Sequence, residues 1–451
     1  MTVEEIRLAA RALVVCGARD FEVAGISTDS RTVKPGDLFV ALVGGNFDGH
    51  DFLRRAVASG ACGAVYSRDF PIGKEDCQKV FLKVPDTLAA LGDIARAYRK
   101  GLSATVVAIT GSNGKTTTKE MTRHILETRM PTAASPASFN NFVGLPLTLF
   151  GADAATRVVI LEMGTNHPGE IARLADIAAP DIGVITNVGR THLEGLKNIE
   201  GVAAAKAELL HALGPGATAI LNADDPALAK MRSLMPSKAF TFGLQTTADV
   251  YATAIERVNG GFAFTINDAV RARLNVPGSH NIYNALAAAA VARRLGLDLP
   301  FIAQRLADFR LPAMRLEETV IRGATIINDA YNANPESMAR GIEELAQRKA
   351  SRKILVFADM LELGESADAL HREMGALAAG AGFDFYLAAG SLARAAVEAI
   401  VAAGVPPACV GFFAKIEDLA RDLNSKLAAG DVVLIKASRA MGLDRVLDFL
   451  D

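Results

Sequence analysis

Short apolar runs alternate with longer amphipathic stretches through the middle of the chain. From about residue 103 the runs ATVVAIT, RVVILEMG, IGVITNVG and ATAILNAD are separated by stretches of helical period, such as GEIARLADIA and IEGVAAAKAELLHAL. Apolar strands that alternate with helices are typical of a parallel sheet covered on both faces. The pattern therefore predicts an α/β domain with a parallel sheet over residues 103–312.

Residues 249–276 interrupt this alternation. DVYATAIERV and FAFTINDAVRARLNV alternate apolar and polar positions on either side of Asn259-Gly260-Gly261. A turn of this kind between alternating runs favours a hairpin. We expect a small antiparallel insertion here, followed by the helix NIYNALAAAAVARRLG.

Two further α/β regions flank the central one. Residues 1–102 hold short strands such as DLFVAL and the turn signal Lys34-Pro35-Gly36-Asp37, which predicts a small α/β domain. After Leu311-Pro312 the alternation begins again with ATIINDAY, KILVFADM, DFYLAAG, CVGFF and DVVLIKAS. This predicts a doubly wound, Rossmann-like domain over residues 313–451. Three domains agree with a length of 451 residues at about 150 residues per domain.

Composition is that of a soluble globular protein. Hydrophobic residues make up 50% and charged residues 22%, and a formal net charge of -2 argues against a general nucleic-acid binder. Cys16, Cys62, Cys77 and Cys409 are scattered without a C-x-x-C pair, so we expect neither a disulfide framework nor a structural zinc site. The N-terminus MTVEEIRLAARALVV does not resemble a signal peptide, and no apolar run reaches the ~20 residues that span a membrane. We expect a cytoplasmic protein without membrane insertion.

The stretch ITGSNGKTTTKE, residues 109–120, is similar to the end of a phosphate-binding loop. The usual form, G-x-x-x-x-G-K-[ST], has a glycine where this chain has an isoleucine. The strand–loop–helix context still suits a phosphate, because backbone N–H groups and the helix N-terminus would face the anion. Gly111 and Gly114 would allow close approach, Lys115 would reach the β- and γ-phosphates, and Thr116 would offer its hydroxyl to Mg²⁺. A capped helix start with a solvated lysine is the plainer alternative.

Polar residues also follow two predicted strands. Glu162 ends a strand in ILEMGTNHPGEI, and Asn187 and His192 follow the next strand in ITNVGRTHLEGL. Ligand sites in open α/β sheets lie at these strand ends. A carboxylate and an imidazole there can share a metal ion, although Mg²⁺ prefers oxygen ligands. From position alone, His192 is equally well a loop histidine bonded to backbone.

Lys206 lies among alanines in EGVAAAKAELLHAL. Lysine is rarely buried without a partner, and burial lowers its pKa and makes the neutral amine reactive. The stretch alone favours a surface lysine whose stem packs along the helix.

Three further polar clusters open a helix or follow strands of the last domain. Asparagines at the helix start can read an adenine edge or cap the helix, and polar strand ends can face a shared cleft, with turn chemistry as the alternative for each. The clusters are His280, Asn281 and Asn284; Asp329, Tyr331, Asn332 and Asn334; and Lys436, Ser438 and Arg439.

Taken in order, these motifs resemble the Mur ligase family of ATP-dependent amide ligases. The resemblance covers nearly the whole chain and rests on ITGSNGKTTTKEM, NNFVGLPLTL, ILEMGTNHPGEI, TNVGRTHLEG, AAAKAEL, GSHNIYNALAA, NDAYNANPESM, ADMLELG and KASRAMGLDRV. The short loop without a glycine at 109 looks like the nucleotide loop of this family. Ala358 stands where the family usually has glycine, and Arg190 occupies an unusual position before His192. Neither departure removes an expected ligand.

The resemblance implies a cytoplasmic step of peptidoglycan precursor synthesis, and we expect the enzyme to act as a monomer. KASRAMGLDRV fits best the addition of D-alanyl-D-alanine to UDP-N-acetylmuramoyl-tripeptide through an acyl phosphate. The third residue of the tripeptide, lysine or diaminopimelate, stays open. The ligase that adds that residue is an alternative, but the Asn-Pro-Arg motif it usually carries is absent. A folylpolyglutamate synthase would lack the TDSRTVKPGDLFVAL domain, and the polar strand ends of the last domain argue against a nucleotide-dependent switch.

The resemblance also implies roles for single residues. Glu162 and His192 would hold Mg²⁺ together with the Thr116 hydroxyl, and Lys206, carbamylated by CO₂, would help to hold a second Mg²⁺. Arg315 would approach the γ-phosphate on domain closure, and Asp329 would lie near the ATP and the incoming amine. With Lys115, His192 and Lys206, these two residues form the expected catalytic set.

The remaining implied contacts divide between nucleotide and substrate. ATP would be bound by Gly111, Ser112, Asn113, Gly114, Lys115, Thr116, Thr117, Asn281 and Arg315. The uridine diphosphate would lie at Ser27, Thr28, Asp29, Ser30 and Arg31, the dipeptide at Asn332 and Asn334, and the substrate-facing pair of the central domain would be Asn140 and Asn141.

Overall fold

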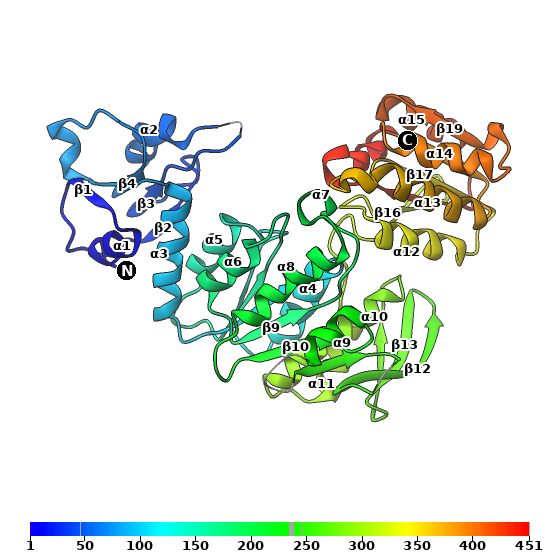
Figure 1. Ribbon diagram of the computed structural model, residues 1–451, viewed down its shortest axis with the longest axis horizontal. Helices are drawn as coiled ribbons and strands as arrows, with labels where there is room; N and C mark the ends of the chain where they lie inside the picture. The colour runs from blue at the N-terminus through cyan, green and yellow to red at the C-terminus, as the bar shows by residue number, and fades with distance from the viewer. Residues whose placement is uncertain (46, 234–238, 246, 451) are drawn as a thin grey trace.

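The computed structural model describes residues 1–45, 47–233, 239–245 and 247–450. Three sheets, each with its own helices, follow one another along the chain, and Figure 1 shows them as three domains in chain order. The predicted α/β architecture is confirmed. None of the helices within the described residues is long and apolar enough to cross a membrane.

The N-terminal domain is built on a five-stranded sheet in the order β1-β5-β4-β3-β2, parallel except for its edge strand β1. Its strands are β1 Leu13–Cys16, β2 Gly25–Ser27, β3 Asp37–Val40, β4 Gly63–Tyr66 and β5 Val80–Lys83, and its helices are α1 Val3–Ala10, η1 Gly49–Phe52, α2 Leu53–Ala58, η2 Lys74–Gln78 and α3 Thr87–Gly101. Helix α3 begins where the Asp86 carboxylate accepts the N–H groups of Leu88 and Ala89. Its far end packs on the central domain, where the Tyr98 hydroxyl donates to the Ala152 carbonyl over 2.5 Å.

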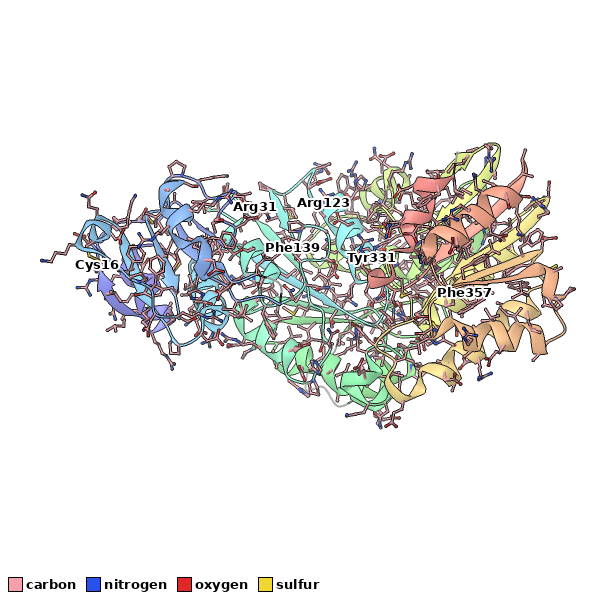
Figure 2. All side chains as sticks on the ribbon, turned by 90° about the horizontal axis from the view of Figure 1, so that it is seen from above. Cys16, Arg31, Arg123, Phe139, Tyr331 and Phe357 are labelled. Atoms are coloured by element: carbon pink, nitrogen blue, oxygen red, sulfur yellow. A yellow bond between two sulfur atoms is a disulfide. The ribbon has the colours of Figure 1, made fainter. Side chains whose placement is uncertain are left out.

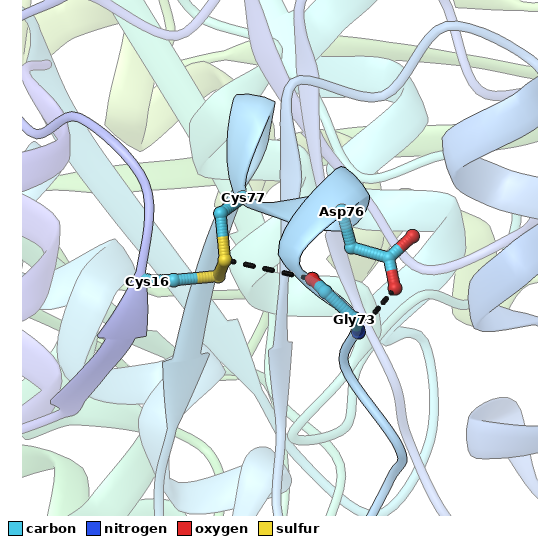
Figure 3. The surroundings of a disulfide bond; sticks show 4 residues. All are labelled: Cys16, Gly73, Asp76 and Cys77. Atoms are coloured by element: carbon cyan, nitrogen blue, oxygen red, sulfur yellow. Dashed lines mark hydrogen bonds between the residues drawn. A yellow bond between two sulfur atoms is a disulfide. The ribbon is translucent and has the colours of Figure 1, made fainter.

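A disulfide joins Cys16 of β1 to Cys77 of η2 (Figure 3). Their Cα atoms lie 5.3 Å apart although 61 positions separate them in sequence. The Asp76 carboxylate accepts the Gly73 N–H over 2.8 Å and holds the turn that carries Cys77. The expectation from cysteine spacing was therefore wrong for this pair, because the fold, and not the spacing, brings the two residues together. Cys62 and Cys409 are free.

We expect a reductant to lower the melting temperature of the N-terminal domain. In the chain-entropy description, a cross-link over a loop of this length stabilises the fold by about 4 kcal/mol through the unfolded state. Calorimetry with and without reductant measures the shift, and Cys16→Ser should melt like the reduced protein and ignore the reductant. Equal melting temperatures for oxidised and reduced wild type would contradict the prediction.

The central domain is built on a nine-stranded sheet in the order β14-β13-β12-β11-β10-β9-β6-β8-β7. Its parallel part comprises β6 Thr105–Thr110, β7 Thr132–Ala134, β8 Val158–Glu162, β9 Ile182–Ile185, β10 Thr218–Asn222 and β11 Phe240–Gly243. The helices are α4 Lys115–Leu126, α5 Gly144–Phe150, α6 Glu170–Ala178, α7 Leu193–Leu196, α8 Ile199–His211, α9 Pro226–Ser233, α10 His280–Arg294 and α11 Leu299–Asp308. Strand β6 lies between β8 and β9, so the loops after these three strands share one edge of the sheet.

The antiparallel insertion is confirmed, with β12 Val250–Val258, β13 Gly261–Ile266 and β14 Val270–Leu274. It is not a separate layer, because β12 pairs in parallel with β11 and extends the central sheet. Helix α10 is buried along most of its length, since its alanines allow close packing against this sheet.

The C-terminal domain has a six-stranded sheet in the order β15-β16-β20-β17-β18-β19. The strands are β15 Glu317–Ile321, β16 Ala324–Asn328, β17 Arg352–Phe357, β18 Phe385–Ala389, β19 Val410–Phe413 and β20 Asp431–Lys436, and all are parallel except the edge strand β15. The helices are α12 Pro335–Ala346, η3 Gly364–Ser366, α13 Ala367–Gly380, α14 Ala393–Ala402, η4 Pro407–Cys409, α15 Ile416–Lys426, η5 Arg439–Met441 and η6 Leu443–Phe449. Residues at or after the ends of β16, β17 and β20 lie against the central domain.

Candidate active site

A cavity of about 580 Å³ lies between the central and C-terminal domains. The loop after β6, the ends of β8 and β9 and the start of α10 form its central side. The ends of β16 and β20 and the start of α12 form its other side. Polar strand ends of two domains therefore share one cleft.

The glycine loop has the backbone that a phosphate cradle needs. Gly111 has φ 149° and Gly114 has φ 82°, and both angles lie in the region that favours glycine. A Cβ would lie 1.9 Å from the Thr186 hydroxyl at Gly111 and 2.2 Å from the Asn284 amide oxygen at Gly114. The place where the longer motif has a glycine belongs here to the buried strand β6, so the loop is complete without it.

Lys115 and Thr116 open α4 directly after this loop. The Lys115 amine donates to the Gly111 carbonyl over 2.8 Å. Burial lowers the pKa of Lys115, and the negative charge of Glu162 opposes that shift. The guanidinium of Arg315, which precedes the C-terminal sheet, donates to the Thr116 hydroxyl over 2.8 Å. Two cations thus approach the loop from two domains.

Glu162 is a buried carboxylate without an ion-pair partner among the described residues. It is 1% exposed, and its two oxygens accept from the Thr116 hydroxyl over 2.8 Å and from the Asn140 amide over 2.9 Å. Both donors are neutral, and Lys115, whose charge interacts with this carboxylate, does not form an ion pair with it. A carboxylate in this state suits a bound cation.

His192 lines the same cavity, and its Nδ1 lies 2.6 Å from Glu362 Oε2 of the C-terminal domain. The ring is therefore held by a side chain and not by the backbone. No group of three or more His, Cys, Asp or Glu side chains suited to a metal occurs in the described part of the chain. Mg²⁺ is commonly held by one or two carboxylates completed by water and phosphate oxygens, so this composition does not argue against it.

Lys206 is 1% exposed on α8, so the interpretation as a surface lysine is wrong. Burial lowers the pKa of its amine well below the usual value, and the charge of Lys115 adds to the shift. No hydrogen bond or ion pair of the amine occurs among the described residues. Lys206 is not among the described residues that line the cavity. Burial thus favours the neutral form of this amine, near enough to Lys115 to feel its charge.

The C-terminal side of the cavity is organised by a buried ion pair. Lys436 is 2% exposed and its amine lies 2.5 Å from Asp329, while it also donates to the Asn332 carbonyl over 3.1 Å. Asn334 caps α12 by accepting the Ser337 N–H, and its amide donates to the Asn113 side chain of the glycine loop over 2.9 Å. These contacts fix the strand ends that the sequence identified.

The start of α10 forms the opposite wall. The Asn281 amide donates to the Pro277 carbonyl over 2.7 Å and its oxygen accepts from Asn284 over 2.9 Å. Burial lowers the pKa of His280 to about 3, with further lowering by the charges of Arg340 and Lys436, so its imidazole is neutral. A wall of neutral amide and imidazole groups suits an uncharged heterocycle.

Two groups of residues expected to bind substrate either lie outside the cavity or make hydrogen bonds within the protein. Asn141 lines the cavity, but its oxygen accepts the N–H groups of Val143 and Gly144 and so caps α5. The stretch from Ser27 to Arg31 lies in the N-terminal domain and outside the cavity, and Figure 2 shows Arg31, Phe139 and Tyr331 in this order along the long axis. Within that stretch Arg31 and Asp29 form a 2.7 Å ion pair, which lowers the pKa of Asp29 to about 2.

Comparison with known proteins agrees with this geometry. Three family models match in order: "Mur ligase family, catalytic domain" over residues 22–99, "Mur ligase middle domain" over 109–292 and "Mur ligase, glutamate ligase domain" over 314–439. The UDP-N-acetylmuramoyl-tripeptide--D-alanyl-D-alanine ligase of Bacillus subtilis is 34% identical over 94% of this chain and 92% of its own length.

This chain belongs to the Mur ligase family.

Solved structures of the family share the whole fold. A crystal structure of MurF from Acinetobacter baumannii matches with a TM-score of 0.89 and 30% identity, over 100% of this chain and 98% of its own. The MurF ligase of Thermotoga maritima, solved in complex with ADP, matches with a TM-score of 0.82 and 30% identity, over 94% and 96% of the two chains.

Two strand-end residues that the sequence marked without a role have contacts at the site. Asn187 exchanges hydrogen bonds with the backbone of Asn113, and Tyr331, which lines the cavity, stacks under the Arg315 guanidinium at 4.1 Å. Their positions at strand ends were a usable signal. Arg340 and Glu362 also line the cavity, and only the docking of two domains places them there; Glu362 belongs to the ADMLELG motif, but nothing in that motif pointed to this contact.

Two groups of ion pairs join the C-terminal domain to the central domain of this Mur ligase. Arg190 lies 3.0 Å from Glu336, at the start of α12, and 2.8 Å from Glu373 of α13. Arg257 of β12 lies 2.9 Å from Glu344, which is 3% exposed near the other end of α12. The unusual Arg190 of the sequence is thus an interdomain contact.

We expect Arg190→Ala to shift the population of docked and undocked C-terminal domains about fivefold towards the undocked form. Partly exposed pairs of this kind contribute about 1 kcal/mol. Single-molecule FRET between the two domains measures the populations. Arg421→Ala removes an equally long side chain whose ion pair stays within α15, and it should leave the populations unchanged. An undisturbed distribution in Arg190→Ala would show that these pairs do not hold the domains.

Proposed function

We propose that this chain is an ATP-dependent ligase that joins D-alanyl-D-alanine to UDP-N-acetylmuramoyl-tripeptide. The observation that carries the proposal is the contact between Arg315 and Thr116, because it brings a cation of the third domain to the nucleotide loop of the second. Relatives with this activity in their names match over nearly the whole chain. The proposed domains are residues 1–102 for the nucleotide sugar, 103–312 for ATP and 313–451 for the amine substrate.

The donors in the cleft fit Mg²⁺ as the cofactor. Glu162 supplies a buried carboxylate that forms no ion pair among the described residues, Thr116 a hydroxyl and His192 a ring nitrogen. Bound there, Mg²⁺ would neutralise phosphate charge during transfer. Lys206 is proposed to carry a carbamate, supported by its buried and strongly acidified amine.

The reaction begins with attack of the tripeptide's terminal carboxylate on the γ-phosphorus of ATP, with ADP as the leaving group. The amine of D-alanyl-D-alanine then attacks the acyl carbon, and the tetrahedral intermediate collapses to an amide and phosphate. Lys115 and Arg315 neutralise charge on the transferred phosphoryl group. The Asp329–Lys436 pair fixes the strand ends towards the incoming amine, and the docked third domain excludes water from the acyl phosphate.

Three substrate regions are proposed along the molecule. The uridine diphosphate lies at the stretch from Ser27 to Arg31, Asn140 and Asn141 face the peptide, and Asn332 and Asn334 face the dipeptide. Asn281 lies at the adenine, supported by the neutral wall at the start of α10.

The enzyme is proposed to act as a cytoplasmic monomer. Thiols are kept reduced in most cytosols, so the bond between Cys16 and Cys77 is the feature that weighs against this location. Thiol labelling of freshly lysed cells tests it directly.

Phosphate release with ATP, Mg²⁺ and the nucleotide-sugar tripeptide, measured with and without D-alanyl-D-alanine, tests the function. Release that needs both acceptors, with a product mass equal to their sum minus water, is expected. Release with a single amino acid and the shorter nucleotide-sugar peptide would assign the preceding ligase step. Release without either acceptor would make the chain a nucleotide-dependent switch.

A further inference from the structure

The third domain reaches the proposed metal site through one side chain. Glu362, in the ADMLELG stretch after β17, lies with Oε2 2.6 Å from His192 Nδ1 of the central domain. Both side chains line the cavity. Backbone contacts support the pair, since the Glu194 N–H donates to the Glu362 carbonyl over 3.1 Å.

Both partners hold a backbone conformation that side-chain-bearing residues rarely adopt. The φ angles are 54° at His192 and 64° at Glu362, in the left-handed region. Such conformations persist where the surrounding structure fixes them, and they gather at functional sites. Gly364 leaves little room against this turn, because a Cβ there would lie 3.1 Å from Glu194 Cα. The turns at His192 and Glu362 are thus held in conformations that bring the two side chains into contact.

We propose that Glu362 is a positioning residue for His192, so that docking of the third domain and binding of a divalent cation are coupled. The inference rests on the proposed magnesium site. A carboxylate at Nδ1 fixes the ring orientation and the tautomer, and it leaves the Nε2 lone pair for a cation. Because coupling is reciprocal, the cation favours docking as much as docking favours the cation.

The ring without this carboxylate would lose its fixed orientation. The other charged groups of the cleft do not replace it: Lys115 donates to its own loop, and Glu162 is occupied by Thr116 and Asn140. Arg190, two residues before His192, is engaged by Glu336 and Glu373. Glu362 is therefore the carboxylate that the structure supplies to His192.

The test is Mn²⁺ binding to the full-length protein with a non-hydrolysable ATP analogue, followed by electron paramagnetic resonance. Glu362→Gln should weaken Mn²⁺ binding about tenfold, since partners of ligating histidines contribute effects of this size. Glu365→Gln, an exposed neighbour in η3, should bind Mn²⁺ like wild type. Interdomain FRET should show that Mn²⁺ increases docking in wild type but not in Glu362→Gln.

Two further variants separate the outcomes. Arg190→Ala weakens docking but keeps Glu362. When Arg190→Ala and Glu362→Gln lose docking to the same extent, Arg190→Ala should bind Mn²⁺ more tightly. Equal affinities would overturn the positioning role and leave a docking contact only. If His192→Ala weakens Mn²⁺ binding and Glu362→Gln does not, the inference fails and the metal site stands. If neither variant changes Mn²⁺ binding, the proposed metal site itself is wrong.

Discussion

Lys115→Ala is expected to lower kcat/KM for ligation by at least about a thousandfold. Removing one preorganised donor from a transition-state charge costs about 10²–10³ in rate, and Lys115 carries a full charge at the end of the loop. Its amine needs only a short movement from the Gly111 carbonyl, 2.8 Å away, to meet a phosphate held by the same loop. Initial rates of phosphate release with both acceptors give the number.

A matched variant separates the loss of charge at the loop from a general loss of charge. Lys100→Ala removes an exposed lysine near the end of α3 that does not line the cavity, and should keep wild-type rates. Thermal unfolding should be nearly the same for both variants. Wild-type turnover by Lys115→Ala would remove the nucleotide assignment of the loop.

Lys206→Ala is expected to abolish ligation to a similar extent, although the residue does not line the cleft. Burial and the charge of Lys115 lower the pKa of the amine well below its usual value, which favours the neutral form that reacts with CO₂. The carbamate would add a negative charge within reach of the positive charge of Lys115. In wild type, activity measured in CO₂-depleted buffer, with and without added bicarbonate, tests for the carbamate on Lys206.

Chemical rescue distinguishes the carbamate from simple packing. Lys206→Ala leaves space, and short carboxylic acids such as acetate or propionate should restore part of the activity. Lys206→Met fills the space with an apolar chain of similar length, so it should keep the fold, lose activity and show no rescue. Full activity of Lys206→Met would return the lysine to a packing role.

Much of the fold and about one side of the site could be predicted from sequence. The parallel strands are recognisable in the sequence as apolar runs. Glu162 and Asp329 each follow or end one of these runs, and ligands of such sheets bind at the ends of the strands. The hairpin at Asn259-Gly260 was equally visible. Strand β7, at three residues, and the exposed edge strand β15 carry too weak a pattern to be recognised.

What sequence could not show depends on contacts between distant segments. The contacts of Arg190, of Glu362 and of the Cys16–Cys77 pair have no local signature, since the partners lie far along the chain. The burial of Lys206 belongs to the same class: its helix is rich in alanine on all sides, and only the packed neighbours decide which side is inside.

Two arginines of the central domain, Arg190 and Arg257, form ion pairs with the two ends of α12 and limit how the third domain can move. Glu336 and Glu344 are eight residues apart, about 12 Å along the helix, and each is held by an arginine of the central domain. A rigid domain that is held at two points retains one rotation, about the line that joins these points. Rocking of the third domain about the long axis of α12 would keep both of these pairs, while it would break the Arg190–Glu373 pair on α13 and open the cleft at Glu362 and His192. Product release and substrate entry would then follow one path, and an inhibitor wedged along α12 would block both.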